Sequence, residues 1–237
     1  MNRRKFIYSS SLASLSVMGL NSCNIRNKDV KITILHTNDV HSQIEPFPFN
    51  HDKYPDRGGF ARRANIFKGL LKINPNTLIF DAGDIFQGTP YFNFFQGDLE
   101  LKLMKKMGYN AATIGNHEFD AGLNRLRKNI LNNNFQFISS NYDFTNTELE
   151  GLISKYKIYK KEGIKIGVFG LGIELNGLVN SSLYKETKYY DPVEITQEMT
   201  DILKNKENCD LIICISHLGH SYQNTKISDL KLGSLTS

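Results

Sequence analysis

The stretch Thr113-Ile114-Gly115-Asn116-His117-Glu118-Phe119-Asp120 decides the fold of this chain and points to its chemistry. The apolar residues 111–114 predict a buried strand, which ends at a glycine and gives way to an amide, an imidazole and two carboxylates. An amide oxygen is a hard metal ligand, and an imidazole near its own pKa is a proton donor or a neutral ligand. Asp120 lies three residues after His117, so in a tight turn it can accept a hydrogen bond from one imidazole nitrogen. The alternative is a polar turn in which Asp120 caps a helix over residues 123–131.

On both sides of this stretch, apolar runs of strand length alternate with amphipathic helical patterns. The strands are predicted at residues 30–35, 77–80, 111–114, 135–139, 164–171 and 211–215. The helices are predicted at residues 60–71, 99–107, 123–131 and 191–203, the last opening with a capping aspartate and a proline. Continuous apolar strands between helices indicate an α/β fold with a largely parallel sheet that helices cover.

Composition restricts the class of protein. The chain has 237 residues, of which 40% are hydrophobic and 22% charged, which suits one globular domain with a sizeable core. The net charge of +5 is spread along the chain, so a nucleic-acid polymer is not expected as a partner. After the leader, only Cys209 and Cys214 remain, and we interpret them as small buried hydrophobes rather than a disulfide.

The first 23 residues predict an export signal. A charged start at residues 3–5 precedes an apolar run, residues 6–20, that is too short to span a bilayer. The start resembles a twin-arginine signal. Residues 20–23 resemble a lipoprotein cleavage site, with Cys23 as the lipidated residue, and an ordinary cleaved signal with a chance cysteine is the alternative. We therefore expect export to the periplasm or cell envelope, a lipid anchor at Cys23, and a folded domain over residues 30–237.

Potential metal ligands follow four of the predicted strands. Asp39 and His41 follow the first strand, Asp84 the second, Asn116 the third and His217 the last. In open α/β sheets the carboxyl ends of the strands form the ligand-binding edge. Turn chemistry alone does not account for this set, since turns use glycine, proline and serine as readily.

The types of ligand restrict which metal ions the site can bind. Without a thiolate, the set is not a structural zinc knuckle, and mixed carboxylate, amide and imidazole ligands suit manganese, iron or zinc. Asp39 and His41 can bind one ion, Asp84 can bridge two, and Asn116 and His217 would hold the second. Two such cations can bind a phosphate and activate water.

The ordered motifs carry a family resemblance. Residues 34–41, 57–63, 83–90, 115–120 and 216–217 resemble the calcineurin-like metallophosphoesterases, and most of all their exported bacterial 5'-nucleotidase branch. The resemblance runs from about Lys31 to about His220 and implies a four-layer α/β/β/α sandwich. It implies the same two metal sites and makes His117 and Asp120 the catalytic pair that stabilises the transition state and assists the leaving group.

The chain departs from that family pattern at its carboxyl end. The family has a further motif, a glycine followed by two histidines, or a histidine and a glutamine, spaced by one residue, which supplies one more ligand to each metal. No such motif precedes Ser237, and His220 lies too early to replace it. We therefore expect a sandwich that is incomplete at the C-terminus. The family's second, nucleotide-binding domain is expected on a separately encoded chain.

The leading functional prediction is a dinuclear metal-dependent phosphoester hydrolase that acts on nucleotides outside the cytoplasm, like a 5'-nucleotidase. Two alternatives stay open: a cyclic-nucleotide phosphodiesterase or thiosulfohydrolase of the same family, and a catalytically inactive fragment. No substrate-binding residue is assigned. A membrane is expected as a partner only through the lipid anchor at Cys23.

Overall fold

The computed structural model describes residues 29–219. The expected leader with Cys23 and the segment that contains His220 lie outside the described residues. The chain divides into the units Met1–Lys31 and Ile32–Ser237, and all the elements below belong to the second unit. Within residues 29–219, no helix is both long enough and apolar enough to cross a membrane.

A parallel sheet carries the first three sets of predicted ligands. Its strands are β1 (Thr33–Thr37), β2 (Thr77–Asp81) and β3 (Ala111–Ala112), paired in the order β1-β2-β3. Every residue of the central strand β2 is buried, as expected for a strand covered on both faces. The predicted strand 135–139 is reduced to single bridges at Phe137 and Ile138.

A second sheet is present as well, as the four-layer sandwich implied by the family resemblance requires. It consists of β5 (Tyr156–Lys161), β6 (Ile164–Leu171) and β8 (Leu211–Ser216), where β5 pairs antiparallel and β8 parallel to β6. Strand β5 was missed because lysines interrupt its apolar residues, which stay only half-buried. A short antiparallel pair, β4 (Tyr142–Asp143) and β7 (Lys188–Tyr189), lies beside these sheets.

The helices predicted from amphipathic patterns are confirmed. They are α2 (Phe60–Ile73), α4 (Asp98–Met107), α5 (Gly122–Asn133) and α7 (Pro192–Asp201), the last continuing as a π-helical turn, Ile202–Lys206. Asp191 caps α7 by accepting hydrogen bonds from the N–H groups of Val193 and Glu194. Two short helices, α3 (Pro90–Phe95) and α6 (Ser181–Tyr184), were not predicted.

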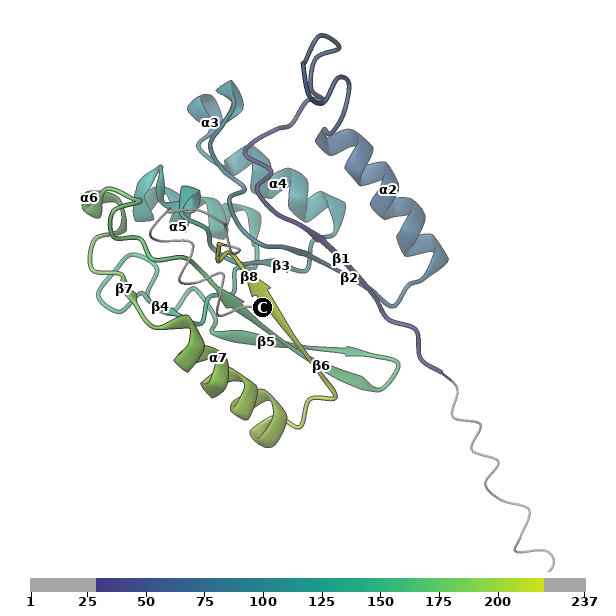
Figure 1. Ribbon diagram of the computed structural model, residues 1–237, viewed down its shortest axis with the longest axis vertical. Helices are drawn as coiled ribbons and strands as arrows, with labels where there is room; N and C mark the ends of the chain where they lie inside the picture. Colours follow the sequence, from purple (N-terminus) through teal and green to yellow (C-terminus); the bar gives the residue numbers. More distant parts are fainter. Residues whose placement is uncertain (1–28, 220–237) are drawn as a thin grey trace, which may run out of the picture. The chain divides into compact units, whose positions relative to one another are not determined.

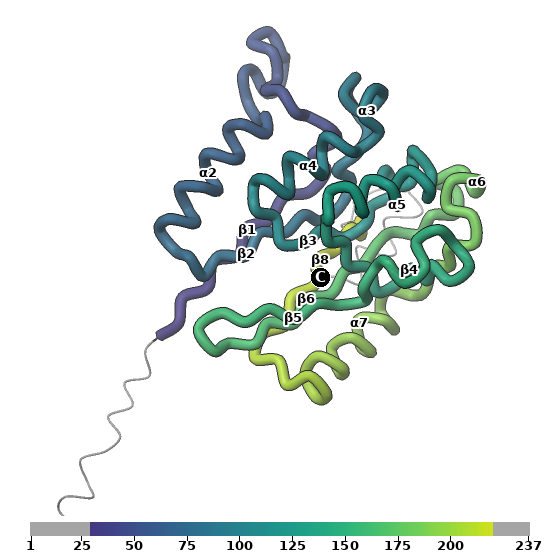
Figure 2. The backbone as a smooth tube through the Cα atoms, turned by 180° about the vertical axis from the view of Figure 1, so that it is seen from behind, coloured from purple at the N-terminus to yellow at the C-terminus, as the bar shows by residue number. Residues whose placement is uncertain are grey.

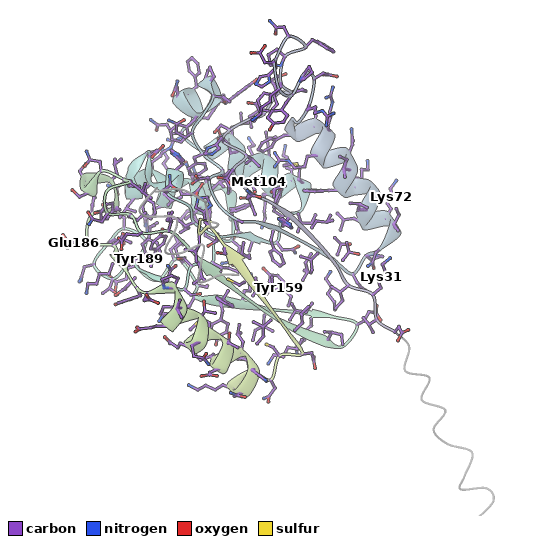
Figure 3. All side chains as sticks on the ribbon, in the orientation of Figure 1. Lys31, Lys72, Met104, Tyr159, Glu186 and Tyr189 are labelled. Atoms are coloured by element: carbon purple, nitrogen blue, oxygen red, sulfur yellow. The ribbon has the colours of Figure 1, made fainter. Side chains whose placement is uncertain are left out.

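Three apolar clusters separate four layers. The first joins the β1-β2-β3 sheet to α2, α4 and α5, and includes Met104, which is labelled in Figure 3. The second lies between the two sheets, where Phe80 packs against Tyr159. The third joins the second sheet to α7. Figures 1 and 2 show α2 and α4 outside the first sheet and α7 outside the second, so the predicted α/β/β/α order is confirmed for the described residues.

The two cysteines differ from the sequence prediction. Both are free thiols, as expected, but Cys209 is half-buried and Cys214 is exposed. Cys214 lies on β8, an edge strand among the described strands, and this position explains its exposure. The prediction that both are buried is therefore wrong for Cys214.

Candidate metal centre

Two loops that follow β1 and β2 lie side by side at the edge of the first sheet. The Asp39 N–H donates to the Gly83 carbonyl at 3.0 Å, and the His41 N–H donates to the Asp84 carbonyl at 3.1 Å. Asp39, His41 and Asp84 all adopt positive φ angles, of 49°, 42° and 55°. Left-handed backbone is unfavourable for such residues and clusters at functional sites. The loops thus hold these side chains in a conformation that an isolated chain would avoid.

Asp84 is the centre of the predicted ligand set. Its carboxylate is buried, with Oδ2 3.3 Å from Nε2 of His217 and 3.9 Å from Nε2 of His41. Asp39 is more exposed, and its Oδ1 lies 3.8 Å from Nε2 of His41. Four strands, β1, β2, β3 and β8, therefore bring ligand-type side chains to one point, as the sequence predicted.

Backbone carbonyls orient both histidines. Nδ1 of His41 lies 3.2 Å from the Phe86 carbonyl, and Nδ1 of His217 lies 2.8 Å from the Ala82 carbonyl. When Nδ1 donates its proton to a carbonyl, Nε2 presents its lone pair to a metal. In both residues that nitrogen faces Asp84.

His117 and Asp120 form the predicted pair. Nδ1 of His117 lies 2.7 Å from Oδ2 of Asp120, which leaves Nε2 free of that carboxylate. The His117 N–H donates to Oδ1 of Asp84 at 2.9 Å, and its ring meets that of His41 edge-on at 5.2 Å between centroids. Asp120 does not cap α5, whose N-cap is Ala121 and has no side-chain hydrogen bond. The alternative of a simple capping turn is therefore wrong.

Asn116 completes the predicted set. It is half-buried and lines a cavity of about 650 Å³ together with Asp39, Asp84 and His217. This cavity extends between the two sheets along Ile34 of β1 and other apolar residues.

Glu118 is the functional residue that sequence reasoning missed. Its fully buried carboxylate accepts four backbone hydrogen bonds: from Asp84 at 2.9 Å, Ile85 at 2.7 Å, Phe86 at 3.3 Å and Gly115 at 2.6 Å. These donors belong to the loops after β2 and after β3. One side chain therefore ties the loop that carries Asp84 to the loop that carries Asn116 and His117. Its position within residues 113–120 was the only signal in the sequence.

Asp81 supports the same loop from below. It is fully buried, accepts the Gly83 N–H at 3.0 Å and accepts a hydrogen bond from the Thr37 hydroxyl. Burial raises the pKa of Asp81 to about 7. Such buried partners orient the groups that bind a metal.

The charges at the centre stabilise one another without a metal. Burial would raise the pKa of Asp84, but the hydrogen bond and charge of His217 hold it below its ordinary value. Burial would lower the pKa of His217, but Asp84 raises it to about 9. The hydrogen bond to Asp120 raises the pKa of His117 above its ordinary value. These carboxylate and imidazole groups thus shift one another's pKa values toward the charged forms.

The donor set fits divalent metal ions. Two groups of three ligand atoms lie within 4.8 Å of one another: Asp39, Asp84 and His217, and His41, Asp84 and His117. Asp84 belongs to both groups, and oxygen and imidazole donors without thiolate suit manganese, iron or zinc. This grouping pairs Asp39 with His217, whereas the sequence paired Asp39 with His41, so the division of ligands between two ions stays a prediction.

Comparison with known proteins gives consistent matches. Residues 32–233 match the family model for calcineurin-like phosphoesterases. The chain is 36% identical over 202 residues to a 5'-nucleotidase of Vibrio cholerae, covering 84% of this chain and 35% of that protein. It is 33% identical to an NAD 5'-nucleotidase of Haemophilus influenzae, covering 85% of this chain and 34% of that protein.

A solved structure has the same fold. The crystal structure of a 5'-nucleotidase precursor from Thermus thermophilus superposes with a TM-score of 0.73 at 32% identity, covering 80% of this chain and 37% of that one. The chain thus spans about a third of the length of the curated relatives it matches. Since the family model covers most of the chain, and the sandwich brings its ligand-bearing loops to one edge, the chain belongs to the calcineurin-like phosphoesterase family.

Proposed function

We propose that this domain hydrolyses phosphoesters of nucleotides with two divalent metal ions. The observation that carries the proposal is the position of Asp84, which belongs to both groups of ligand atoms and lies beside the His117–Asp120 pair. Asp39 and His41 would hold one ion, Asn116 and His217 the other, and Asp84 both. Manganese, zinc and iron all suit these donors.

Bound cations at this point would neutralise the charge of a phosphoester and make water more acidic. Residues of this chain would orient the groups and transfer the proton. Asp120 holds Nδ1 of His117 at 2.7 Å, so Nε2 of His117 can face the substrate. The hydrogen bond to Asp120 raises the pKa of His117, which favours the protonated ring that can give a proton to the leaving oxygen.

Relatives support a nucleotide as the substrate. The matched proteins of Vibrio cholerae and Haemophilus influenzae are a 5'-nucleotidase and an NAD 5'-nucleotidase. We propose a nucleotide-binding domain as the partner of this domain. A chain that contains that domain should lower KM for AMP when it is added in trans.

We propose export and lipid anchoring as well, on the evidence of the leader sequence alone. Arg3 and Arg4 would direct twin-arginine export, and Cys23 would receive the lipid. Fractionation of expressing cells should find the protein in the envelope, and Cys23→Ser should release it. A cytoplasmic protein that is unaffected by Cys23→Ser contradicts the proposal.

Metal-dependent release of phosphate from AMP tests the activity. Asp84→Ala and His117→Ala should each abolish it, whereas His51→Ala in the exposed loop before α2 should not. Activity that survives both of the first two substitutions, or that persists in a chelator, would refute the proposed site. His51→Ala removes an imidazole outside the ligand set and so controls for a general effect of histidine loss.

A further inference from the structure

A second cavity adjoins the candidate metal centre. It has a volume of about 590 Å³, within the usual range for small-molecule sites, and Asp39 and His41 form part of its wall. Phe47, Arg62 and Arg63 also line it. A ligand held at the metal centre can therefore extend into this cavity past the Asp39–His41 segment.

Arg63 is a fixed cation in that wall. Its guanidinium lies over the Phe60 ring at 4.2 Å from the centroid and donates to the Tyr109 hydroxyl at 3.2 Å. The Tyr109 oxygen is itself 2.7 Å from the Thr37 hydroxyl, so the anchor of Arg63 is held in turn by β1. Among residues 29–219, no carboxylate lies within 4.0 Å of Arg63. Its half-buried positive charge thus forms no direct ion pair in this part of the chain, and it acts on the buried Asp81 carboxyl only through the intervening Tyr109 and Thr37 hydroxyls.

Arg62 is a second, more exposed cation beside it. It pairs with Asp56 at 2.7 Å, and the two side chains are 48% and 38% exposed. Exposed pairs of this kind contribute little stability, so Arg62 can exchange Asp56 for an anionic ligand at small cost.

Two glycines, Gly59 and Gly88, form part of the wall of this cavity. Gly59 has a φ of 86°, and a Cβ atom there would lie 2.9 Å from the Pro46 nitrogen. Gly88 has a φ of 101°, and a Cβ atom there would lie 2.8 Å from the His41 carbonyl oxygen. Side chains are therefore disfavoured at both positions, and close backbone contacts fix this part of the cavity wall.

We propose that this cavity binds a second phosphate, carried by the leaving part of the substrate. The guanidinium groups of Arg62 and Arg63 match the planar, bidentate recognition of phosphate oxygens. Because the cavity shares Asp39 and His41 with the metal centre, one molecule can place its scissile phosphate at the centre and its second phosphate on the arginines. The proposal rests on the proposed phosphoesterase function and adds a preference for doubly phosphorylated substrates.

The test compares three substrates on the full chain loaded with manganese: AMP, ADP and adenosine 3',5'-bisphosphate. The last two differ from AMP by a second phosphate, adjacent in one and across the ribose in the other. At least one should exceed AMP in kcat/KM, and Arg63→Gln should lower that preference about tenfold or more by raising KM. Arg63→Lys keeps the charge and should retain part of the preference.

Two further variants keep the outcome decisive. Arg62 is exposed, so Arg62→Gln should not disturb folding. It should lower the preference for the doubly phosphorylated substrate by a smaller factor than Arg63→Gln does. Lys68→Gln removes the same charge from an exposed position of the same helix and should leave the preference unchanged. Equal kcat/KM values for all three substrates, or a preference that survives both arginine substitutions, would overturn the proposal.

Binding measurements separate this proposal from the proposed activity. Calorimetric titration of the His117→Ala chain with AMP and with adenosine 3',5'-bisphosphate needs no turnover. Tighter binding of the bisphosphate that Arg63→Gln removes supports the second-phosphate site even if no hydrolysis is found. Equal binding of the two ligands contradicts it. A loss of affinity on Arg63→Gln that is equally large for inorganic phosphate alone contradicts it as well.

Discussion

Glu118→Gln is the substitution that most sharply tests how the centre is held together. In the native protein, Oε1 accepts the N–H groups of Ile85 and Phe86, and Oε2 accepts those of Asp84 and Gly115. A glutamine amide has only one oxygen. In either orientation, two buried N–H donors therefore face an NH₂ group that cannot accept from them.

The magnitude follows from those two donors. A buried donor without a partner costs about 1–3 kcal/mol, so two of them cost roughly 2–6 kcal/mol. Removing a buried carboxylate offsets part of this loss, since burial and the charge of Asp84 raise the pKa of Glu118 to about 7. We expect a clear net loss in the free energy of unfolding. The loops should also lose their fixed spacing, so metal affinity should fall.

Denaturant unfolding of the metal-free chain measures the first effect, and calorimetric titration with manganese measures the second. Glu100→Gln is the matched control: Glu100 is also fully buried, and in the described part of the chain its carboxylate oxygens have no hydrogen-bond partner. The control should be as stable as the native chain, or more stable. A Glu118→Gln chain with native stability and native metal affinity would refute the bracing role.

Three further substitutions or conditions have defined outcomes. Gly115→Ala would place a Cβ atom 2.3 Å from Oδ1 of Asp84, so manganese affinity should fall; Gly69→Ala, where nothing lies within 4 Å, should leave it unchanged. Asp120→Asn keeps the size of the side chain but removes its charge from His117, so kcat for AMP should fall about tenfold or more at unchanged KM. A KM that rises by the same factor as kcat falls would argue against a catalytic pair. The pKa of metal-free His217 is about 9, so it is protonated at pH 7 and a metal must displace that proton. Manganese affinity should therefore rise from pH 6 to 9, and calorimetry in two buffers should count about one proton released per chain at pH 7; a flat profile contradicts this.

The convergence of the candidate ligands could be predicted because strands and helices alternate regularly along the sequence. Apolar runs located the strands, and the carboxyl ends of parallel strands share one edge, so the residues after them had to converge. Strand β6 was predicted with its observed bounds, Ile164–Leu171. Asp84 and His117 could be identified because a polar group directly follows a glycine or an apolar run at each strand end.

Other features depend on contacts that periodicity does not encode. The bracing role of Glu118 exists only because two loops turn their N–H groups toward one point. The positive φ angles of Asp39 and Asp84 are held by backbone hydrogen bonds between loops, and no glycine at those positions signals them. Strand β5 of the second sheet was missed by pattern reasoning because it is rich in lysine and only half-buried.

Metal stoichiometry tests the central claim most directly. The purified chain is stripped of metal, titrated with manganese by calorimetry, and analysed for bound metal after dialysis, beside its Asp84→Ala variant. If Asp84 is the ligand that two ions share, the native chain should bind two ions and Asp84→Ala at most one, with lower affinity. A native chain that binds no metal, or an Asp84→Ala chain that still binds two ions with native affinity, would contradict the assigned centre.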